Sequence, residues 1–492
     1  MIEQIQSPKS ILLNTSLFLG FALGLQNLYL NQLYTAPSSS NNLEIKAKSA
    51  STQPLKKTIE QVELKTSSIA TSKRKASKKT VTNLRNKPQP INKQIVKLKK
   101  AKVLAIAPPS PQNQILDPEV SQKFSKAQVL NDLDQRISKD FKIHKRLKKR
   151  VGFWFDIYTK HDSDKYVLHH TKFPWLVYKV IDIKPFYNGK GPTWLKKSRG
   201  EKLVKKEKKK LKNRLLALSK RKNFRNLNAY DRHLYKLIKG IRGPIRKNLK
   251  IAAYKFRTQV GQKNFIQTGI LKSIPFLPMM EREFENYGLP TELTRIPFVE
   301  SSFNVDAFSR VGASGIWQII PRSGKEFLIL NKHIDERNSP LKATQFARKH
   351  LRRDYRILRS WPLAITAYNH GVGGVRKGVK KLKSKSIIKL ISYYSSPSFK
   401  FASRNFYTCF LAVLHAEKYK EQYFNVPNDT TTLNLQSITV NKKSRVKNIA
   451  KNLKLNLKTL VKHNLDLKKA IKANVHLPKG FELFIPTTEK QL

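Results

Sequence analysis

A long segment without aromatic residues limits where this chain can build a packed core. Between Ala36 and Lys123 there is no Phe, Trp or Tyr, and residues 46–102 contain 17 Lys or Arg but only two acids. Such a segment buries too little apolar surface to offset the conformational entropy lost on folding. We therefore predict that residues 36–123 are a disordered basic linker and that folded structure begins near Phe124.

An apolar stretch near the N-terminus indicates export. The residues from Leu17 to Leu25 are all apolar or glycine, Lys9 precedes them, and the next basic residue is Lys46. The stretch has the length of the hydrophobic region of a signal peptide and is short for a full membrane span. Positive charge does not hold its C-terminal flank in the cytoplasm. We expect residues 1–35 to be a signal or membrane-anchor segment.

The charge of the chain suggests a polyanionic partner. Its 492 residues include 98 Lys and Arg against 32 Asp and Glu, a formal net charge of +66. Nucleic acid, an acidic membrane surface and an acidic polymer all fit such a balance, which does not indicate a fold. The single cysteine, Cys409, cannot form an internal disulfide, so cysteine usage leaves the compartment open.

The region after the linker, residues 124–254, is predicted to be a basic extension of mixed structure. Its aromatic runs at 151–160 and 173–183 contain residue types that favour short strands. The very basic stretch at 196–222 has helical character. We expect short strands and helices in this extension.

A helical domain is predicted over residues 255–424. The segment after Pro340 has apolar residues at a spacing of about 3.6, which is typical of an amphipathic helix. Ser339 and Pro340 suit the start of that helix, because serine caps a helix and proline is tolerated at its first position. The chain as a whole is therefore predicted to be mainly α.

One acidic residue in this domain stands at the end of an apolar run. Leu293, Ile296 and Val299 have helical spacing, Pro297 is expected to bend the helix, and Glu300 follows directly. An exposed glutamate at a helix end would be the ordinary interpretation. The residues downstream favour a sugar-binding site instead, because they are small, polar or aromatic.

The candidate site residues lie in two stretches after this acid. Ser309 and Gln318 belong to a loop rich in small residues, and Tyr368 and Asn369 stand at a helix end closed by glycines. Carboxylate, hydroxyl, amide and aromatic groups together suit a sugar polymer. The nearest other acids, Asp306 and the pair at 335–336, are interpreted as turn or salt-bridge residues.

Five motifs in this domain carry a resemblance to a known family. In chain order they are V-E-S-S-F-N (299–304), S-x-x-G-A-S-G-I-W-Q (309–318), D-E-R-N-S-P (335–340), A-Y-N-x-G (367–371) and F-A-S-R-N-F-Y (401–407). Together they resemble the lytic murein transglycosylases, and most closely the membrane-bound lytic murein transglycosylase D group, a branch of the lysozyme-like superfamily. Two departures from the pattern are the isoleucine before Trp317 and His370 at a position that is usually small.

The resemblance implies a lysozyme-like helical fold and a role for each candidate residue. Glu300 would be the one catalytic acid, and Ser309 would support that acid or the acetamido group of the substrate. Gln318, Tyr368 and Asn369 would line the sugar cleft. The implied substrate is the glycan strand of peptidoglycan. The protein is expected in the periplasm of a Gram-negative bacterium, anchored to the membrane through its N-terminal segment.

The implied chemistry accounts for a single carboxylate. Cleavage of a β-1,4 glycosidic bond ordinarily uses two carboxyl groups. The acetamido group of muramic acid can stabilise the cationic centre, and its own C6 hydroxyl can close onto C1, so a 1,6-anhydro end forms. Glu300 would donate a proton and then take one back, with a pKa raised to about 6 by an apolar wall.

Two other functions stay open on the sequence. A hydrolytic, lysozyme-type muramidase would use the same acid with water as the nucleophile. A basic protein that binds the cell wall or nucleic acid without catalysis would also explain the charge. Export and the sugar-site residues disfavour specific nucleic-acid binding, and the intact Glu300 disfavours a protein without catalysis.

The C-terminal segment, residues 436–487, is predicted to be a small module of a strand, two helices and a strand. The residues expected to face inward are Ile449, Ala450, Leu453, Leu457 and Leu460. The segment resembles a LysM module, a binder of N-acetylglucosamine chains, although Lys442 and Lys443 replace the usual Gly-Asp. A generic βααβ cap is the alternative. Because the acid and the cleft precede residue 424, we expect removal of this module to leave cleavage intact.

No metal or cofactor is predicted. His169 and His170 form an isolated pair without further ligands, and the glycines at 371–374 lack the strand and the third glycine of a dinucleotide fingerprint.

Overall fold

The computed structural model describes residues 124–188, 191–426 and 434–487, and all of these lie in one compact unit. The predicted signal or anchor segment (1–35) and linker (36–123) fall outside the described residues. Within the described part, every helix is too short or too polar to cross a bilayer. The predicted mainly α class is confirmed.

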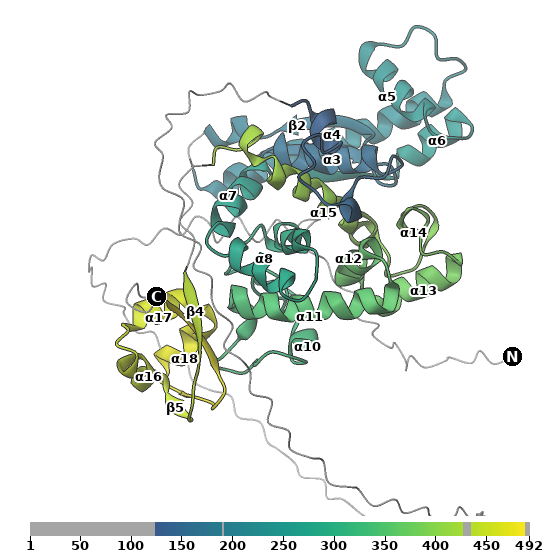
Figure 1. Ribbon diagram of the computed structural model, residues 1–492. Coiled ribbons are helices and arrows are strands. Elements are labelled where there is room, and N and C mark those ends of the chain that lie inside the picture. The colour runs from purple at the N-terminus through teal and green to yellow at the C-terminus, as the bar shows by residue number, and fades with distance from the viewer. Residues whose placement is uncertain (1–123, 189–190, 427–433, 488–492) are drawn as a thin grey trace, which may run out of the picture. The chain divides into compact units, whose positions relative to one another are not determined.

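The N-terminal extension combines helices with a small sheet (Figure 1). Its elements are α2 (Lys126–Leu130), η2 (Lys139–Phe141), α3 (Lys148–Thr159), β1 (Lys165–His170), β2 (Val177–Asp182), η3 (Lys184–Asn188), α4 (Thr193–Lys220), α5 (Ala229–Lys239), α6 (Ile245–Ala252) and β3 (Phe256–Val260). The three strands form an antiparallel sheet in the order β2-β1-β3. The boundary predicted at residue 255 therefore needs correction, because β3 pairs with β1 of the extension.

The strand predicted over residues 151–160 is wrong. This run lies in the helix α3, where Val151, Trp154 and Tyr158 are completely buried. α3 packs against the long helix α15 (Phe401–Lys418), so that almost every side chain of the run contacts protein. The run has no polar face, and periodicity alone could not separate a buried helix from a buried strand.

The helical domain that carries the candidate site begins with α7. Its elements are α7 (Lys263–Ser273), α8 (Leu277–Glu285), η4 (Thr291–Arg295), α9 (Ile296–Ser301), α10 (Pro321–Gly324), η5 (Glu336–Asn338), α11 (Pro340–Leu358), α12 (Trp361–His370), α13 (Val372–Leu382), α14 (Ile387–Tyr393), α15 and η6 (Lys420–Gln422). The predicted start of α11 is confirmed, since the Ser339 side chain accepts a hydrogen bond from the Lys342 backbone and Pro340 is the first helical residue.

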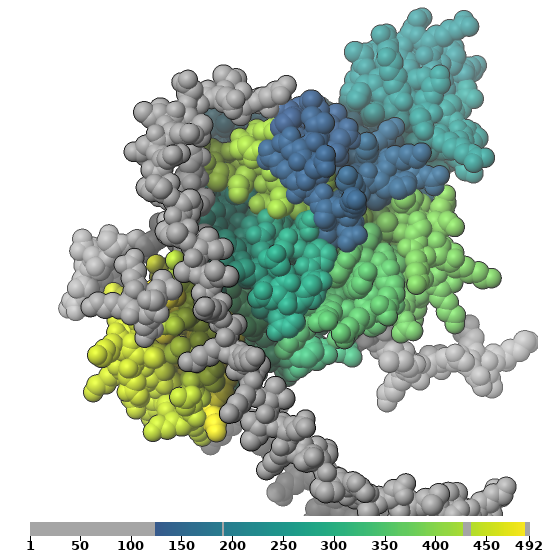
Figure 2. Space-filling model, in the orientation of Figure 1, coloured from purple at the N-terminus to yellow at the C-terminus, as the bar shows by residue number. Residues whose placement is uncertain are grey.

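The short helix α9 packs against α15 and the turn η4. α11 packs against α8 and α12, and α15 packs against α12 and α9. Figure 1 shows α11 running across the domain with α8 and α12 beside it. In Figure 2 the teal segment with α8 and the green segment with α11–α14 lie directly against each other. One hydrophobic cluster extends from Val129 in the extension to Phe424, so the extension and the domain share part of their interior.

The C-terminal module has two small sheets and three helices. Its elements are β4 (Leu435–Thr439), β5 (Ser444–Arg445), α16 (Val446–Asn452), α17 (Leu457–His463), η7 (Leu465–Leu467), α18 (Lys468–Lys472), β6 (His476–Leu477) and β7 (Glu482–Pro486). β4 pairs with β7, and the helix α18 was not predicted. Of the residues expected to face inward, Ile449, Ala450 and Leu460 are buried and Leu453 and Leu457 pack against them.

Candidate active site around Glu300

Glu300 is the penultimate residue of a short, completely buried helix. We expected one helix bent at Pro297, but the chain forms the turn η4 and then α9, with Pro297 in the first turn of α9. Every residue of α9 is buried, and only 4% of Glu300 is exposed. The carboxyl group is therefore shielded from solvent.

The chain leaves α9 sharply just after Glu300. Ser302 and Phe303 have positive φ angles, which end the helix, and the ring of Phe303 packs on that of Phe298 at 4.6 Å. The hydroxyl of Ser301 donates to the carbonyl of Ile316 at 2.8 Å. This bond ties the end of α9 to the loop that contains Gln318.

A buried ion-pair cluster fixes the other end of α9. Arg295 is 3% exposed and donates from Nε to Glu417 on α15 at 2.9 Å. Its Nη1 also pairs with Glu281 on α8. These partners are distant in sequence, so the cluster could not be predicted from the sequence. It holds α9 between α8 and α15.

Burial raises the pKa of Glu300 to about 8. Within the described part of the chain, no side chain donates a hydrogen bond to this carboxyl group or forms an ion pair with it, so nothing stabilises its charged form. We expected a pKa of about 6 from the sequence; the direction is the same and the shift is larger. At neutral pH Glu300 therefore holds a proton.

Tyr368 lies close enough to Glu300 for the two side chains to interact electrostatically. Burial raises the pKa of Tyr368 well above its usual value, and the nearby carboxylates of Glu300 and Asp354 raise it further. Its hydroxyl donates to the carbonyl of Trp317 at 2.8 Å. Trp317 in turn stacks on Phe284 and donates from its indole to Thr344 at 2.9 Å. Tyr368 lies near Glu300 and is bonded to the loop that contains Gln318.

Ser309 and Gln318 lie in one loop and are both buried. The Ser309 hydroxyl accepts from the Ala313 backbone at 2.8 Å, which leaves its own proton available to donate. Gln318 has a positive φ, and its side-chain nitrogen donates to the carbonyls of Ala307 and Gly315. The carbonyl oxygen of the Gln318 amide has no partner among the described residues.

The neighbouring loop at 335–339 holds this site loop in place. Arg337 donates from Nη1 to the carbonyls of Gly312 and Ile319 at 2.6 and 3.0 Å. Gly315 has a φ of +73°, and a Cβ there would overlap the carbonyl oxygen of Arg337. Only glycine therefore allows the two loops to approach this closely.

Asn369 brings a second unsatisfied group to the end of α12. Its side-chain oxygen accepts from Ser403 at 3.0 Å, while its Nδ2 is buried and has no partner in the described residues. His370 lies beside it and shares Ser403 through Nδ1 at 3.2 Å. A buried amide donor without a partner costs free energy, and its most direct use is to bind a ligand.

The other acids near the site have structural partners, as the sequence suggested. Asp306 is exposed and pairs with Lys468, Asp335 caps η5 and pairs with Arg337, and Glu336 pairs with Lys342.

Asp354 is an acid near the site that the sequence did not indicate. It is completely buried on α11, its pKa is raised to about 6 by burial, and it lies close enough to affect Tyr368.

The described residues hold no cluster of three His, Cys, Asp or Glu suited to a metal. His169 packs between Phe153 and Phe401, and His170 accepts backbone N–H groups from Lys172 and Phe173, so both histidines have structural roles. A cavity of about 1110 Å³ lies in the extension, between α3, β2 and α5, and contains none of the candidate site residues.

Comparison with known proteins places these residues in one family of domains. The profile of the family described as "Transglycosylase SLT domain" matches residues 279–391. The chain carries a transglycosylase SLT domain. Glu300, Ser309, Gln318, Tyr368 and Asn369 all lie within the SLT domain, whose family consists of lytic transglycosylases that act on peptidoglycan.

Individual relatives are similar to this protein over part of its sequence. The "Membrane-bound lytic murein transglycosylase D" of Escherichia coli K12 is 31% identical over 137 residues, 27% of this chain and 30% of that protein. A "Putative tributyltin chloride resistance protein" of Alteromonas sp. M-1 is 33% identical over 114 residues, 23% of this chain and 55% of that protein. The chain thus spans about a third to just over half of these relatives.

Among solved structures, an inactive mutant of the lytic transglycosylase Slt from Pseudomonas aeruginosa is 21% identical. The match covers 40% of this chain and 30% of that chain, with a TM-score of 0.27.

Proposed function

We propose that this protein is a peptidoglycan lytic transglycosylase that cleaves the β-1,4 bond between N-acetylmuramic acid and N-acetylglucosamine. The observation that carries the proposal is Glu300 in the SLT domain: a single buried carboxyl group, protonated at neutral pH, without a second carboxylate that shifts its pKa. Such a group can supply a proton. Among the described residues no second carboxylate affects its pKa, not even the buried Asp354 near Tyr368, so we take the nucleophile from the substrate.

The raised pKa of Glu300 suits both halves of the reaction. In the first half, the Glu300 carboxyl proton passes to the glycosidic oxygen, the bond from C1 to that oxygen breaks, and the acetamido group stabilises the cationic C1. In the second half, the Glu300 carboxylate takes the proton of the C6 hydroxyl as the C6 oxygen bonds to C1. Glu300 is again protonated, and the product ends in 1,6-anhydro-muramic acid.

The remaining candidate residues would bind and orient the sugars. The Ser309 hydroxyl still has a proton to donate to the acid or to the acetamido group. The unpaired Nδ2 of Asn369 would donate to a substrate oxygen, and the free amide oxygen of Gln318 would accept from a sugar hydroxyl. Tyr368 would line the cleft while its bond to Trp317 holds the wall of the site. No cofactor takes part in this scheme.

We also propose that residues 436–487 are a LysM module that binds the same polymer, and that the protein works in the periplasm, attached to the membrane. The excess of basic residues would attract the acidic stem peptides and anionic polymers of the envelope. The E. coli relative is described as membrane-bound, which supports the cell envelope as the location.

Substitution of the acid tests the proposal. Glu300→Gln keeps the shape of the side chain but removes the transferable proton, so release of soluble fragments from purified peptidoglycan should stop while binding persists. Asp306→Asn is the matched control, because Asp306 is exposed and paired with Lys468. The cleavage rate of this control variant should fall by less than about tenfold, which corresponds to roughly 1.4 kcal/mol in the activation free energy. Continued turnover by Glu300→Gln would refute the proposal.

A further inference from the structure

The C-terminal module packs against the SLT domain. Ile334, which precedes η5, is buried in the hydrophobic core of the module, and Ile329 packs against the same core. The Asp335 backbone N–H donates to the carbonyl of Asp466. A loop of the domain is thus part of the interior of the module.

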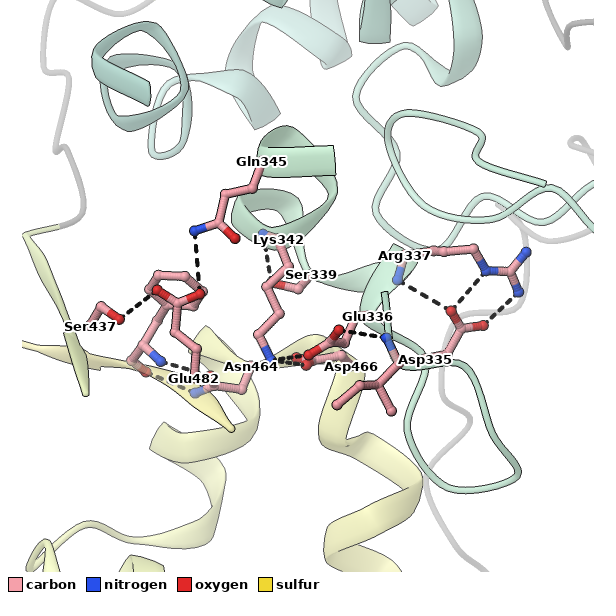
Figure 3. Close-up of polar contacts among 12 residues, drawn as sticks. Asp335, Glu336, Arg337, Ser339, Lys342, Gln345, Ser437, Asn464, Asp466 and Glu482 are labelled. Atoms are coloured by element: carbon pink, nitrogen blue, oxygen red, sulfur yellow. Dashed lines mark hydrogen bonds and ion pairs between the residues drawn. The ribbon is translucent and has the colours of Figure 1, made fainter. Parts of the chain in front are cut away.

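A buried cluster of charges fixes this seam (Figure 3). Lys342 on α11 is 3% exposed and donates to Glu336 at 2.9 Å and to Asp466 of the module at 2.8 Å. The same ammonium group lies 3.6 Å from the centre of the Phe481 ring. A buried cation between two carboxylates and one aromatic face favours one geometry, because removal of the cation would leave two buried carboxylates without a counter-charge.

A cavity of about 250 Å³ opens along this seam. Six of its lining residues bear on recognition: Phe308, Ser314, Asn331 and Asn338 from the SLT domain and Asp466 and Lys469 from the module. Phe308 directly precedes Ser309, and Ser314 forms isolated bridges to Phe308 and Ile319. One wall of the cavity is therefore the same loop that carries Ser309 and Gln318.

The chemistry of the lining points to a sugar. Phe308 is 62% exposed, and an exposed ring offers a flat apolar face. Asp466 is 3% exposed, yet its Oδ1 has no hydrogen-bond partner among the described residues. A buried carboxylate oxygen without a partner is an acceptor for hydroxyl or amide N–H groups. Lys469 adds donors from the module side of the cavity.

We propose that this seam cavity is a saccharide subsite, built jointly by the SLT domain and the module, for one sugar residue of a glycan strand that also occupies the Glu300 site. The proposal rests on the proposed function, since the strand is taken to be peptidoglycan. The charge cluster around Lys342 keeps the two walls in register, so that the module extends the cleft.

Binding of a peptide-free GlcNAc–MurNAc hexasaccharide to the full chain tests this subsite. Glu300→Gln serves as the background, so that the sugar is not cleaved during calorimetry. In that background Phe308→Ala should weaken binding about tenfold, because one aromatic face is lost. Lys469→Ala should weaken it about threefold to tenfold, because one hydrogen bond is lost.

Two controls match these variants in kind and exposure. Tyr393→Ala removes another exposed aromatic ring, and Lys472→Ala removes an exposed lysine one turn along α18. Neither residue lines the seam cavity, so both should bind the hexasaccharide within about twofold of the background, the scatter expected for a surface change. All four variants should retain the melting temperature of the background.

The outcomes separate the subsite from the proposed function. Weakening by both Phe308→Ala and Lys469→Ala supports a shared subsite. Weakening by only one of them, or by neither, would overturn it, because a jointly built site needs both walls. If the Glu300→Gln background bound no hexasaccharide at all, the proposed function would fail and the subsite with it.

Discussion

At the scale of single residues, Glu300 could be identified from the sequence but its surroundings could not. The apolar run before Glu300 and the small residues after it indicated a buried acid, and the structure buries it. Arg295 and Asp354 escaped notice because their roles depend on long-range contacts. Arg295 meets Glu417 across 122 residues of chain, and Asp354 approaches Tyr368 only after α11 and α12 pack together.

The raised pKa of Glu300 predicts how stability depends on pH. Below about 4.5 both the folded and the unfolded protein hold the proton, so Glu300 contributes no pH dependence. Between about 4.5 and about 8 the folded protein keeps a proton that the unfolded chain has lost, so the free energy of unfolding falls as pH rises. The total fall is about 3–5 kcal/mol, because each tenfold difference in proton affinity corresponds to about 1.4 kcal/mol.

Glu300→Gln should remove this dependence, because glutamine stays neutral. The free energy of unfolding of the variant minus that of the wild type should therefore increase with pH, as measured by urea denaturation at pH 4.5, 6.5 and 8.5. Asp306→Asn, at a side chain that is 68% exposed, should show no such trend. Parallel pH curves for Glu300→Gln and the wild type would contradict the burial of a neutral acid.

At the scale of elements, residue types with a specific role in a helix predicted structure correctly, whereas a run of apolar residues alone did not. The start of α11 was predicted correctly, because serine and proline have specific roles in the first turn. The run at 151–160 was assigned to a strand and forms the helix α3, because it is buried almost all round and has no polar face to set a period. Asn464 closes the module by bonding both backbone groups of Phe484, a contact across 20 residues that no local pattern reveals.

The contact between the site loop and the loop at 335–339 should be sensitive to one methyl group. Gly315→Ala places a Cβ against the Arg337 carbonyl at a positive φ, so the loops must separate or strain. We expect a loss of about 2–4 kcal/mol in the free energy of unfolding and a marked loss of activity. Gly373→Ala is the control, since a Cβ there meets nothing within 4 Å. Equal stability of the two variants would show that the close approach is not required.

At the scale of the whole molecule, the sequence suggested separable modules and the structure joins them. The boundary near residue 424 was inferred from the helical pattern and the extent of the family motifs, which carry no information about the ion pairs of Lys342 or the burial of Ile334. The expectation that removal of the C-terminal module leaves cleavage intact therefore has to be modified. Its removal would expose Ile334 and take away one partner of a buried lysine.

Lys342→Met tests the importance of this seam for stability. The change leaves the carboxylates of Glu336 and Asp466 buried together without their cation, which should cost about 3–5 kcal/mol. Lys349→Met, on the exposed face of the same helix, should change the free energy of unfolding by less than about 0.5 kcal/mol. A melting temperature of Lys342→Met equal to that of the control would mean that the charge cluster does not hold the module in place.

The central claim is that one carboxyl group and the substrate's own hydroxyl suffice for cleavage, and digestion of purified peptidoglycan in water enriched in oxygen-18 tests it most directly. Mass spectrometry of the products should show 1,6-anhydro-muramic ends that contain no oxygen-18, because the C6 oxygen and not water bonds to C1. New reducing ends that each carry one oxygen-18 atom would contradict the claim and identify a hydrolase.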